Sequence, residues 1–128
     1  MWYPVLRLRE SGAQVDIAAT GAGKVLHGKY GVPITSDVSF DDVSSADYDG
    51  LYVPGGWAPD KLRRYPQVLR LTREFHEAGK PIAQICHAGW VRLWMRWQVP
   101  QKHDEASGPM ASSRACDGSH LLFFFPHR

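Results

Sequence analysis

Two short apolar runs, each closed by an abrupt turn signal, constrain the fold of this chain more than any other feature. The first run, Leu51–Val53, is closed by the breaker "PGG", and the second, "PIAQI", runs directly into Cys86. Between them, Pro66–Ala78 carries apolar residues at helical spacing and is followed by Gly79 as a C-cap. Strand, helix and strand in this order predict an α/β fold with a parallel sheet covered on both faces.

The flanking segments extend this pattern on the N-terminal side. Pro4–Ser11 reads as a short helix that ends at Gly12, "AQVDIAAT" as a strand, and "KVLHGKYGVPI" as a hairpin with its turn near Gly28–Gly31. The segment "HAGWVRLWMRW" after Cys86 has the length and spacing of a helix. Residues 98–128 show neither the apolar spacing of a helix nor that of a strand. We therefore expect a partial domain over residues 1–97 and an irregular tail over 98–128.

Composition limits the classes of function. A chain of 128 residues suits one domain, and its net charge of +2 comes from 15 basic and 13 acidic residues that are interspersed. Without a basic face we expect no nucleic-acid partner, and without a long apolar run we expect no membrane span. Two cysteines and no signal-peptide pattern favour a cytoplasmic location. The six histidines show no zinc-ligand spacing, so we expect no metal and no cofactor.

Cys86 is the main candidate for chemistry. A corner between a parallel strand and a helix is where α/β folds place their sites, and the helix N-terminus favours thiolate over thiol. The alternative is an inert, buried cysteine that packs as a small apolar residue. His87 could act through its ring or through its backbone N–H. Gly55 and Gly56 end the neighbouring strand, where glycine lets backbone N–H groups approach a carbonyl oxygen closely.

Five tryptophans could line a pocket, but tryptophan at helical spacing is usually part of a core or an interface, so we assign these residues to packing. They are Trp2, Trp57, Trp90, Trp94 and Trp97.

The segment "DYDGLYVPGGWAPDKLRRYPQVLRLTREFHEAGKPIAQICHAGW" resembles the centre of the ThiJ/PfpI superfamily, which includes PfpI-type intracellular proteases and the Parkinson-disease-associated protein deglycase. The resemblance runs from Met1 to Trp90 and includes the "GKYG" turn. It implies a flavodoxin-like sandwich of the class I glutamine amidotransferase type, with Cys86 as the nucleophile. It also implies an oxyanion hole formed by the N–H groups of Gly56 and His87, with the His87 ring as candidate base.

By the same resemblance, the expected function is that of a cysteine hydrolase of the intracellular protease, deglycase or glyoxalase type. The substrate would be a small carbonyl compound or a peptide, and the protein would form a homo-oligomer with a role in the stress response. The motif therefore predicts a site with a reactive cysteine better than it predicts the substrate.

The chain departs from the family pattern at both ends. The family's first strand and a glutamate that hydrogen-bonds the cysteine correspond to positions upstream of Met1, and Glu10, Glu74 and Glu77 do not match that glutamate. After about Val91 the family pattern stops. We therefore expect an incomplete sheet with exposed edges and an open reading frame with a late start and a frameshift near Val91.

Two other functions are considered. A non-catalytic fragment or an interaction or stress-chaperone remnant would keep the core motif without the acid. A class I glutamine amidotransferase shares the nucleophile corner, but it needs a downstream His-x-Glu, and "HDE" at His103–Glu105 follows Cys86 too soon.

Overall fold

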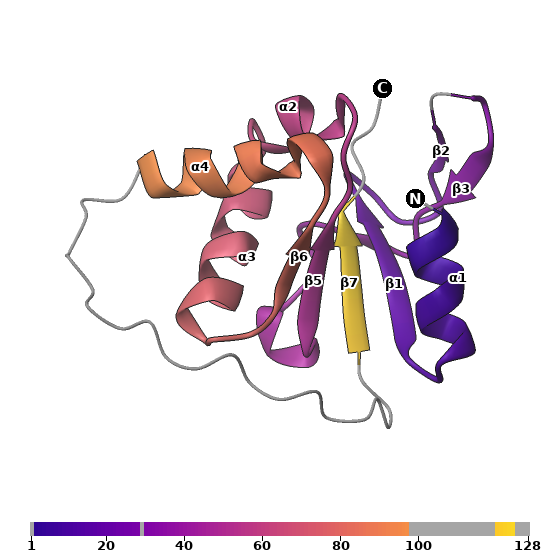
Figure 1. The fold of residues 1–128 in the computed structure, drawn as a ribbon, viewed down its shortest axis with the longest axis horizontal. Coiled ribbons are helices and arrows are strands. Elements are labelled where there is room, and N and C mark those ends of the chain that lie inside the picture. The colour runs from indigo at the N-terminus through magenta and orange to yellow at the C-terminus, as the bar shows by residue number, and fades with distance from the viewer. Residues whose placement is uncertain (1, 29, 98–119, 125–128) are drawn as a thin grey trace.

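The computed structural model describes residues 2–28, 30–97 and 120–124, with side chains described for 2–28 and 30–93. This range contains both helices and strands (Figure 1). In chain order they are α1 (Trp2–Glu10), β1 (Gln14–Ala19), β2 (Val25–His27), β3 (Pro33–Thr35), β4 (Val38–Ser39), the 3₁₀ turn η1 (Ser45–Asp47), β5 (Gly50–Val53), α2 (Ala58–Leu62), α3 (Pro66–Glu77), β6 (Ile82–Gln84), the 3₁₀ turn η2 (Cys86–Ala88), α4 (Gly89–Trp97) and β7 (His120–Phe124).

Five strands form one sheet in the order β4-β1-β7-β5-β6, and all its recorded pairings are parallel. The parallel sheet confirms the α/β fold that the sequence pattern predicts, and the arrangement is flavodoxin-like, as the family resemblance implies. The strands β2 and β3 pair antiparallel as a separate hairpin, which confirms the predicted excursion. The predicted helix after Pro66 is confirmed as α3, and Gly79 follows it with a left-handed φ of 66°.

The tail contributes the central strand of the sheet. Within the segment expected to be irregular, His120–Phe124 forms β7, which lies between β1 and β5 (Figure 1). Its register pairs Leu122 with Asp16 of β1 and with Leu51 of β5. The centre of the sheet, where the family resemblance implies that a strand is absent, is therefore held by a strand from the end of the chain. The rest of the expected tail, residues 98–119 and 125–128, lies outside the described residues.

The strand before Cys86 differs from its predicted character. The sequence predicts a buried strand, but β6 is the last strand on one side of the sheet among the described residues, and its side chains are half-buried or exposed. An apolar run is compatible with an edge position because alanine and isoleucine also tolerate partial exposure. The edge position leaves the corner that follows β6 open to solvent.

Each face of the sheet carries its own apolar core. On one face, Val15 and Ile17 of β1 pack with Val5 of α1 and with the β2–β3 hairpin. On the other, Leu51 and Val53 of β5 pack with α2, α3 and α4. Complete burial of a side chain of this size stabilises the fold by about 1.5–3 kcal/mol. Figure 1 shows α1 on one side of the sheet and α3 and α4 on the other.

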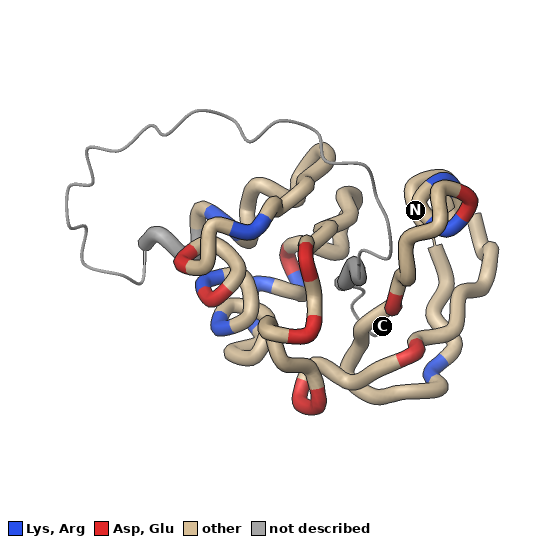
Figure 2. The backbone as a smooth tube through the Cα atoms, turned by 90° about the horizontal axis from the view of Figure 1, so that it is seen from below, with Lys and Arg blue, Asp and Glu red and all other residues tan. Residues whose placement is uncertain are grey.

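Figure 2 shows basic and acidic positions intermixed along the helices and loops. No helix in the described ranges has the length and apolar character needed to cross a membrane.

Candidate functional site

The register of β5 and β6 brings the two turn signals of the sequence together. Val53 pairs with Gln84 in the parallel ladder. Two residues beyond this pair, Gly55 lies against Cys86 at the carboxyl edge of the sheet. The sequence predicts this juxtaposition, because ends of adjacent parallel strands meet at the same edge.

Gly55 is required at its position by the closeness of this approach. A Cβ added there would lie 2.7 Å from Cys86 Cβ and 2.9 Å from the carbonyl oxygen of Ile85. Neither distance is compatible with van der Waals contact, so any larger residue would displace the cysteine corner. The next residue, Gly56, has a left-handed φ of 70° and turns the chain toward α2.

Cys86 occupies a strained backbone position. Its φ is 56°, and it is the one non-glycine with positive φ among the described residues. Such a conformation costs of order 1–3 kcal/mol and persists only where the surroundings enforce it. The Cys86 residue is exposed, and η2 leads directly into α4. The alternative of a buried cysteine is therefore not what the structure has.

The His87 ring turns toward the thiol, although adjacent residues often point apart. Its Nδ1 lies 3.3 Å from Cys86 Sγ, within the range of a sulfur hydrogen bond. The structure thus brings Cys86, His87 and Gly55 together, with Gly56 as the next residue along the chain. A ring at this distance can exchange a proton with the thiol.

No carboxylate supports this pair within residues 2–28 and 30–93, where no Asp or Glu side chain hydrogen-bonds the thiol or the imidazole. Glu10 and Glu74 pair instead with arginines on their own helices. The same ranges hold no group of three His, Cys, Asp or Glu side chains placed to bind a metal ion.

Two tryptophans border the site, and for Trp57 the assignment to packing is wrong. Trp57, just before α2, is 81% exposed, and its ring lies nearly parallel to that of His87, with centroids 6.5 Å apart. Trp90, in α4, is 37% exposed, and its ring centroid lies 4.8 Å from that of His87. The side chains of Trp94 and Trp97 lie outside the described residues. Sequence reasoning missed Trp57 as a site residue, although its place directly after "PGG" was a usable signal.

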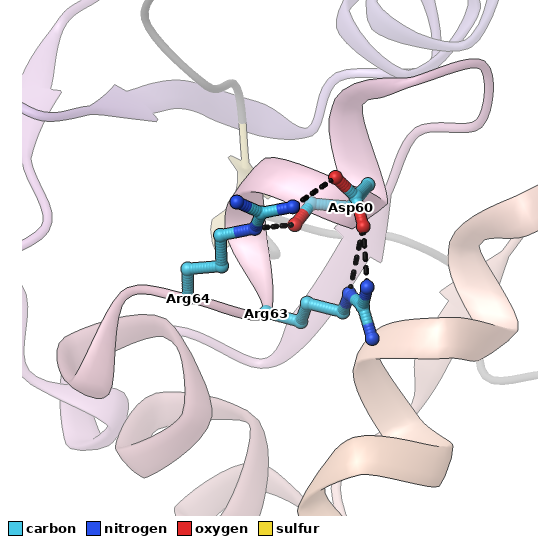
Figure 3. Close-up of polar contacts among 3 residues, drawn as sticks. All are labelled: Asp60, Arg63 and Arg64. Atoms are coloured by element: carbon cyan, nitrogen blue, oxygen red, sulfur yellow. Dashed lines mark hydrogen bonds and ion pairs between the residues drawn. The ribbon is translucent and has the colours of Figure 1, made fainter.

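Asp60 of α2 forms a charged network with the two arginines that follow this helix (Figure 3). Asp60 accepts hydrogen bonds from Arg63 Nε at 3.0 Å and from Arg64 Nη2 at 2.7 Å. The hydrogen bond from Arg63, with further help from Arg64, lowers the pKa of the Asp60 carboxyl below its ordinary value. The Arg63 guanidinium in turn lies 5.9 Å from the centroid of the Trp90 ring.

The chain is similar in sequence to known proteins. The model of the DJ-1/PfpI family matches residues 1–113. The chain is 40% identical over 91 residues to Deglycase PfpI of Pyrococcus furiosus, a match that covers 71% of this chain and 54% of the relative. It is also 40% identical over 85 residues to Protein/nucleic acid deglycase 2 of Escherichia coli, covering 66% of this chain and 49% of the relative. The chain therefore spans about half the length of these curated relatives.

A solved structure is similar as well. It is a two-domain protein from Anabaena variabilis that contains a DJ-1/ThiJ/PfpI-like domain and a ferritin-like domain. The match has a TM-score of 0.69 and 30% sequence identity, and it covers 72% of this chain and 27% of that chain. Motif, topology and comparisons lead to one conclusion: the chain belongs to the DJ-1/PfpI family.

Proposed function

We propose that this chain is a cysteine-dependent hydrolase of the DJ-1/PfpI type, in which Cys86 attacks the carbonyl carbon of a small adduct or a peptide. The observation that carries the proposal is the strained, exposed backbone position of Cys86 with the His87 ring 3.3 Å from its sulfur. Strain of this kind is found at sites where one side chain must be held in a fixed direction. The deglycase names of two relatives agree with carbonyl chemistry.

The reaction that fits these residues is acyl transfer through a thioester. His87 takes the proton of the Cys86 thiol, and the sulfur forms a bond to the carbonyl carbon while the π pair moves onto oxygen. Collapse of this oxyanion breaks the bond to the leaving amine or thiol, which accepts the proton from the imidazole. Water then hydrolyses the thioester and releases the acid. A hemithioacetal forms by the same first step when the substrate is an aldehyde.

The oxyanion would be held by the backbone N–H groups of Gly56 and His87. Both residues follow the ends of adjacent strands, β5 and β6, and Gly55 keeps those ends in contact. Removal of one such donor typically costs about 10²–10³ in rate, so these groups would contribute strongly.

Turnover tests the proposal. The chain with Cys116→Ser should release product from a peptide thioester or from a thiol–glyoxal adduct, and Cys86→Ala added to it should abolish release. His87→Ala keeps the backbone N–H and removes only the ring, so a loss of about 10²-fold or more would assign the base role to the imidazole. Equal, background-level rates in all three chains would contradict the proposal.

The second candidate is a non-catalytic remnant or interaction module of the family. The observation that favours it is the lack, within residues 2–28 and 30–93, of a carboxylate bonded to the Cys86–His87 pair. A chain that is folded by circular dichroism but shows no turnover would support this second candidate.

We also infer a cytoplasmic homo-oligomer, and size-exclusion chromatography with light scattering would test the oligomeric state.

A further inference from the structure

Three apolar side chains near the Cys86–His87 pair are open to solvent: two tryptophans whose rings lie next to the His87 imidazole, and Ile85, which precedes Cys86 in the chain. Trp57 is 81% exposed, Ile85 55% and Trp90 37%. Exposed tryptophan is uncommon because a large apolar area stays in contact with water. An apolar group gathered near a reactive side chain is typical of a binding surface rather than of a solvated face.

Both indole rings lie next to the His87 imidazole, with ring centroids 6.5 Å away for Trp57 and 4.8 Å away for Trp90. The plane of Trp57 is within 9° of the plane of His87, whereas Trp90 is tilted by 53°. Because His87 Nδ1 is 3.3 Å from Cys86 Sγ, a group attached to the sulfur would lie beside this aromatic arrangement. Most of the Trp57 side chain stays uncovered, so a flat group could stack on it.

The charge beside this surface does not favour an acidic substrate. Arg63, the nearby cation, is engaged by the Asp60 carboxylate through Nε at 3.0 Å and also lies over Trp90. A guanidinium already held by a carboxylate offers little to a second anion. The surface next to the thiol is therefore apolar and aromatic, with its neighbouring positive charge compensated.

We propose that Trp57 forms a stacking subsite that selects electrophiles carrying an aryl or similarly flat apolar group close to the carbon attacked by Cys86. This inference rests on the proposed function in that Cys86 is the attacking group. The substrate class is thereby narrowed to aromatic or flat apolar carbonyl compounds and to peptides with an aromatic side chain beside the reacting carbonyl. Trp57 is a specificity-determining residue here and takes no part in bond making.

A matched pair of reagents tests this subsite without any turnover. Iodoacetamide and iodoacetanilide share one reacting carbon and differ by an aryl group. In both, the Cys86 thiolate forms the C–S bond as the C–I bond breaks and iodide leaves with the electron pair. In the Cys116→Ser chain, the ratio of the anilide rate to the amide rate should exceed that of free N-acetylcysteine by about 2- to 10-fold.

Variants test whether Trp57 is the residue that raises the ratio of the anilide rate to the amide rate. Trp57→Ala should lower the ratio to that of the free thiol, and Trp57→Phe should retain most of it. Tyr3→Ala removes an aromatic side chain that is similarly exposed on α1, and it should leave the ratio unchanged. Circular dichroism would verify that each variant is folded.

The outcomes separate this inference from the proposed function. A ratio that Trp57→Ala does not change overturns the subsite, even if Cys86 reacts rapidly with iodoacetamide. An equal loss of both rates in Trp57→Ala also overturns it, because Trp57 would then only position His87. If Cys86 in the folded chain reacts with iodoacetamide no faster than in the urea-unfolded chain, the proposed function is contradicted. The ratio of the anilide rate to the amide rate still tests the subsite in that case.

Discussion

The corner after β6 and the strand β7 differ in the sequence separation of the segments that form them. The corner is built within one stretch of chain, because β5, α3 and β6 follow one another and their register places Gly55 against Cys86. The centre of the sheet is built from the two ends of the chain, because β7 inserts between β1 and β5. The residues of the site are therefore close together in the sequence. One of the two strands that carry them, β5, nevertheless pairs on its other side with β7, which is distant in the sequence.

This difference predicts that damage to β7 and damage to the corner have different signatures. Disruption of β7 should affect the whole fold, whereas disruption of the corner should affect Cys86 first. Four changes, ordered by expected effect, test this contrast.

The largest effect is expected from Leu122→Pro in β7. Proline has no N–H, so a ladder carbonyl facing this central strand loses its donor, at a cost of about 1–3 kcal/mol, and ring clashes add to it. Urea unfolding followed by circular dichroism should show a loss of about 3 kcal/mol or more. Leu122→Val, which keeps the N–H, should cost far less. A Leu122→Pro chain as stable as the parent would show that β7 is not the centre of the sheet.

Next in size is Gly55→Ala at the corner. The added Cβ would meet Cys86 Cβ at 2.7 Å, so the corner must move, at a cost of about 1–3 kcal/mol. The rate of Cys86 alkylation by iodoacetamide should fall by about 10-fold or more. Gly28→Ala serves as the control, since a Cβ there meets no atom within 4 Å. Unchanged alkylation in Gly55→Ala would refute the close approach of the two strand ends.

A smaller effect is expected where β1 is anchored beside β7. The Tyr48 hydroxyl donates to the Asp16 carboxylate at 2.8 Å, and Tyr48→Phe should cost about 1 kcal/mol. Burial, followed by this hydrogen bond, raises the pKa of Tyr48 above its ordinary value of 10.0. The native state therefore holds this proton more tightly than the unfolded chain, so the contribution is complete below about pH 10 and is lost as pH rises further.

The measurement for this pair is urea unfolding at neutral pH and again above pH 10. The difference between the parent and Tyr48→Phe should shrink at the alkaline pH. A difference that grows with pH would contradict the assigned direction of the shift.

The smallest effect is expected from Asp60→Asn, next to the aromatic surface. Hydrogen bonding by Arg63 lowers the pKa of Asp60 below 3.8, so its stabilising contribution is present above that pH and disappears as pH falls through the native value. Surface ion pairs contribute little, so the melting temperature at pH 7 should fall by a few degrees or less. Differential scanning calorimetry at 1 M salt should show a smaller difference. A large, salt-independent loss would mean that Asp60 holds more than its arginine partners.

The fold and the candidate site differ in how far sequence predicts them. The turn after Val53, the helix after Pro66 and the corner at Cys86 follow from breakers and periodicity, which are local properties. The pairing of β7 depends on residues more than 60 positions away, such as Leu51 and Asp16, and no period in "HLLFFF" indicates its neighbours. The residue type of Trp57 does not predict its exposure, because tryptophan occurs both in cores and at binding surfaces, and its place directly after "PGG" is the one signal that the sequence offers.

The central claim is that the folded chain presents Cys86 as an activated nucleophile. The most direct measurement is the second-order rate constant for iodoacetamide alkylation of Cys86 in the Cys116→Ser chain, native and unfolded in urea, at one pH. The reaction should be faster in the native chain than in the unfolded chain, and His87→Ala should remove this difference. A native rate equal to or below the unfolded rate would contradict this claim.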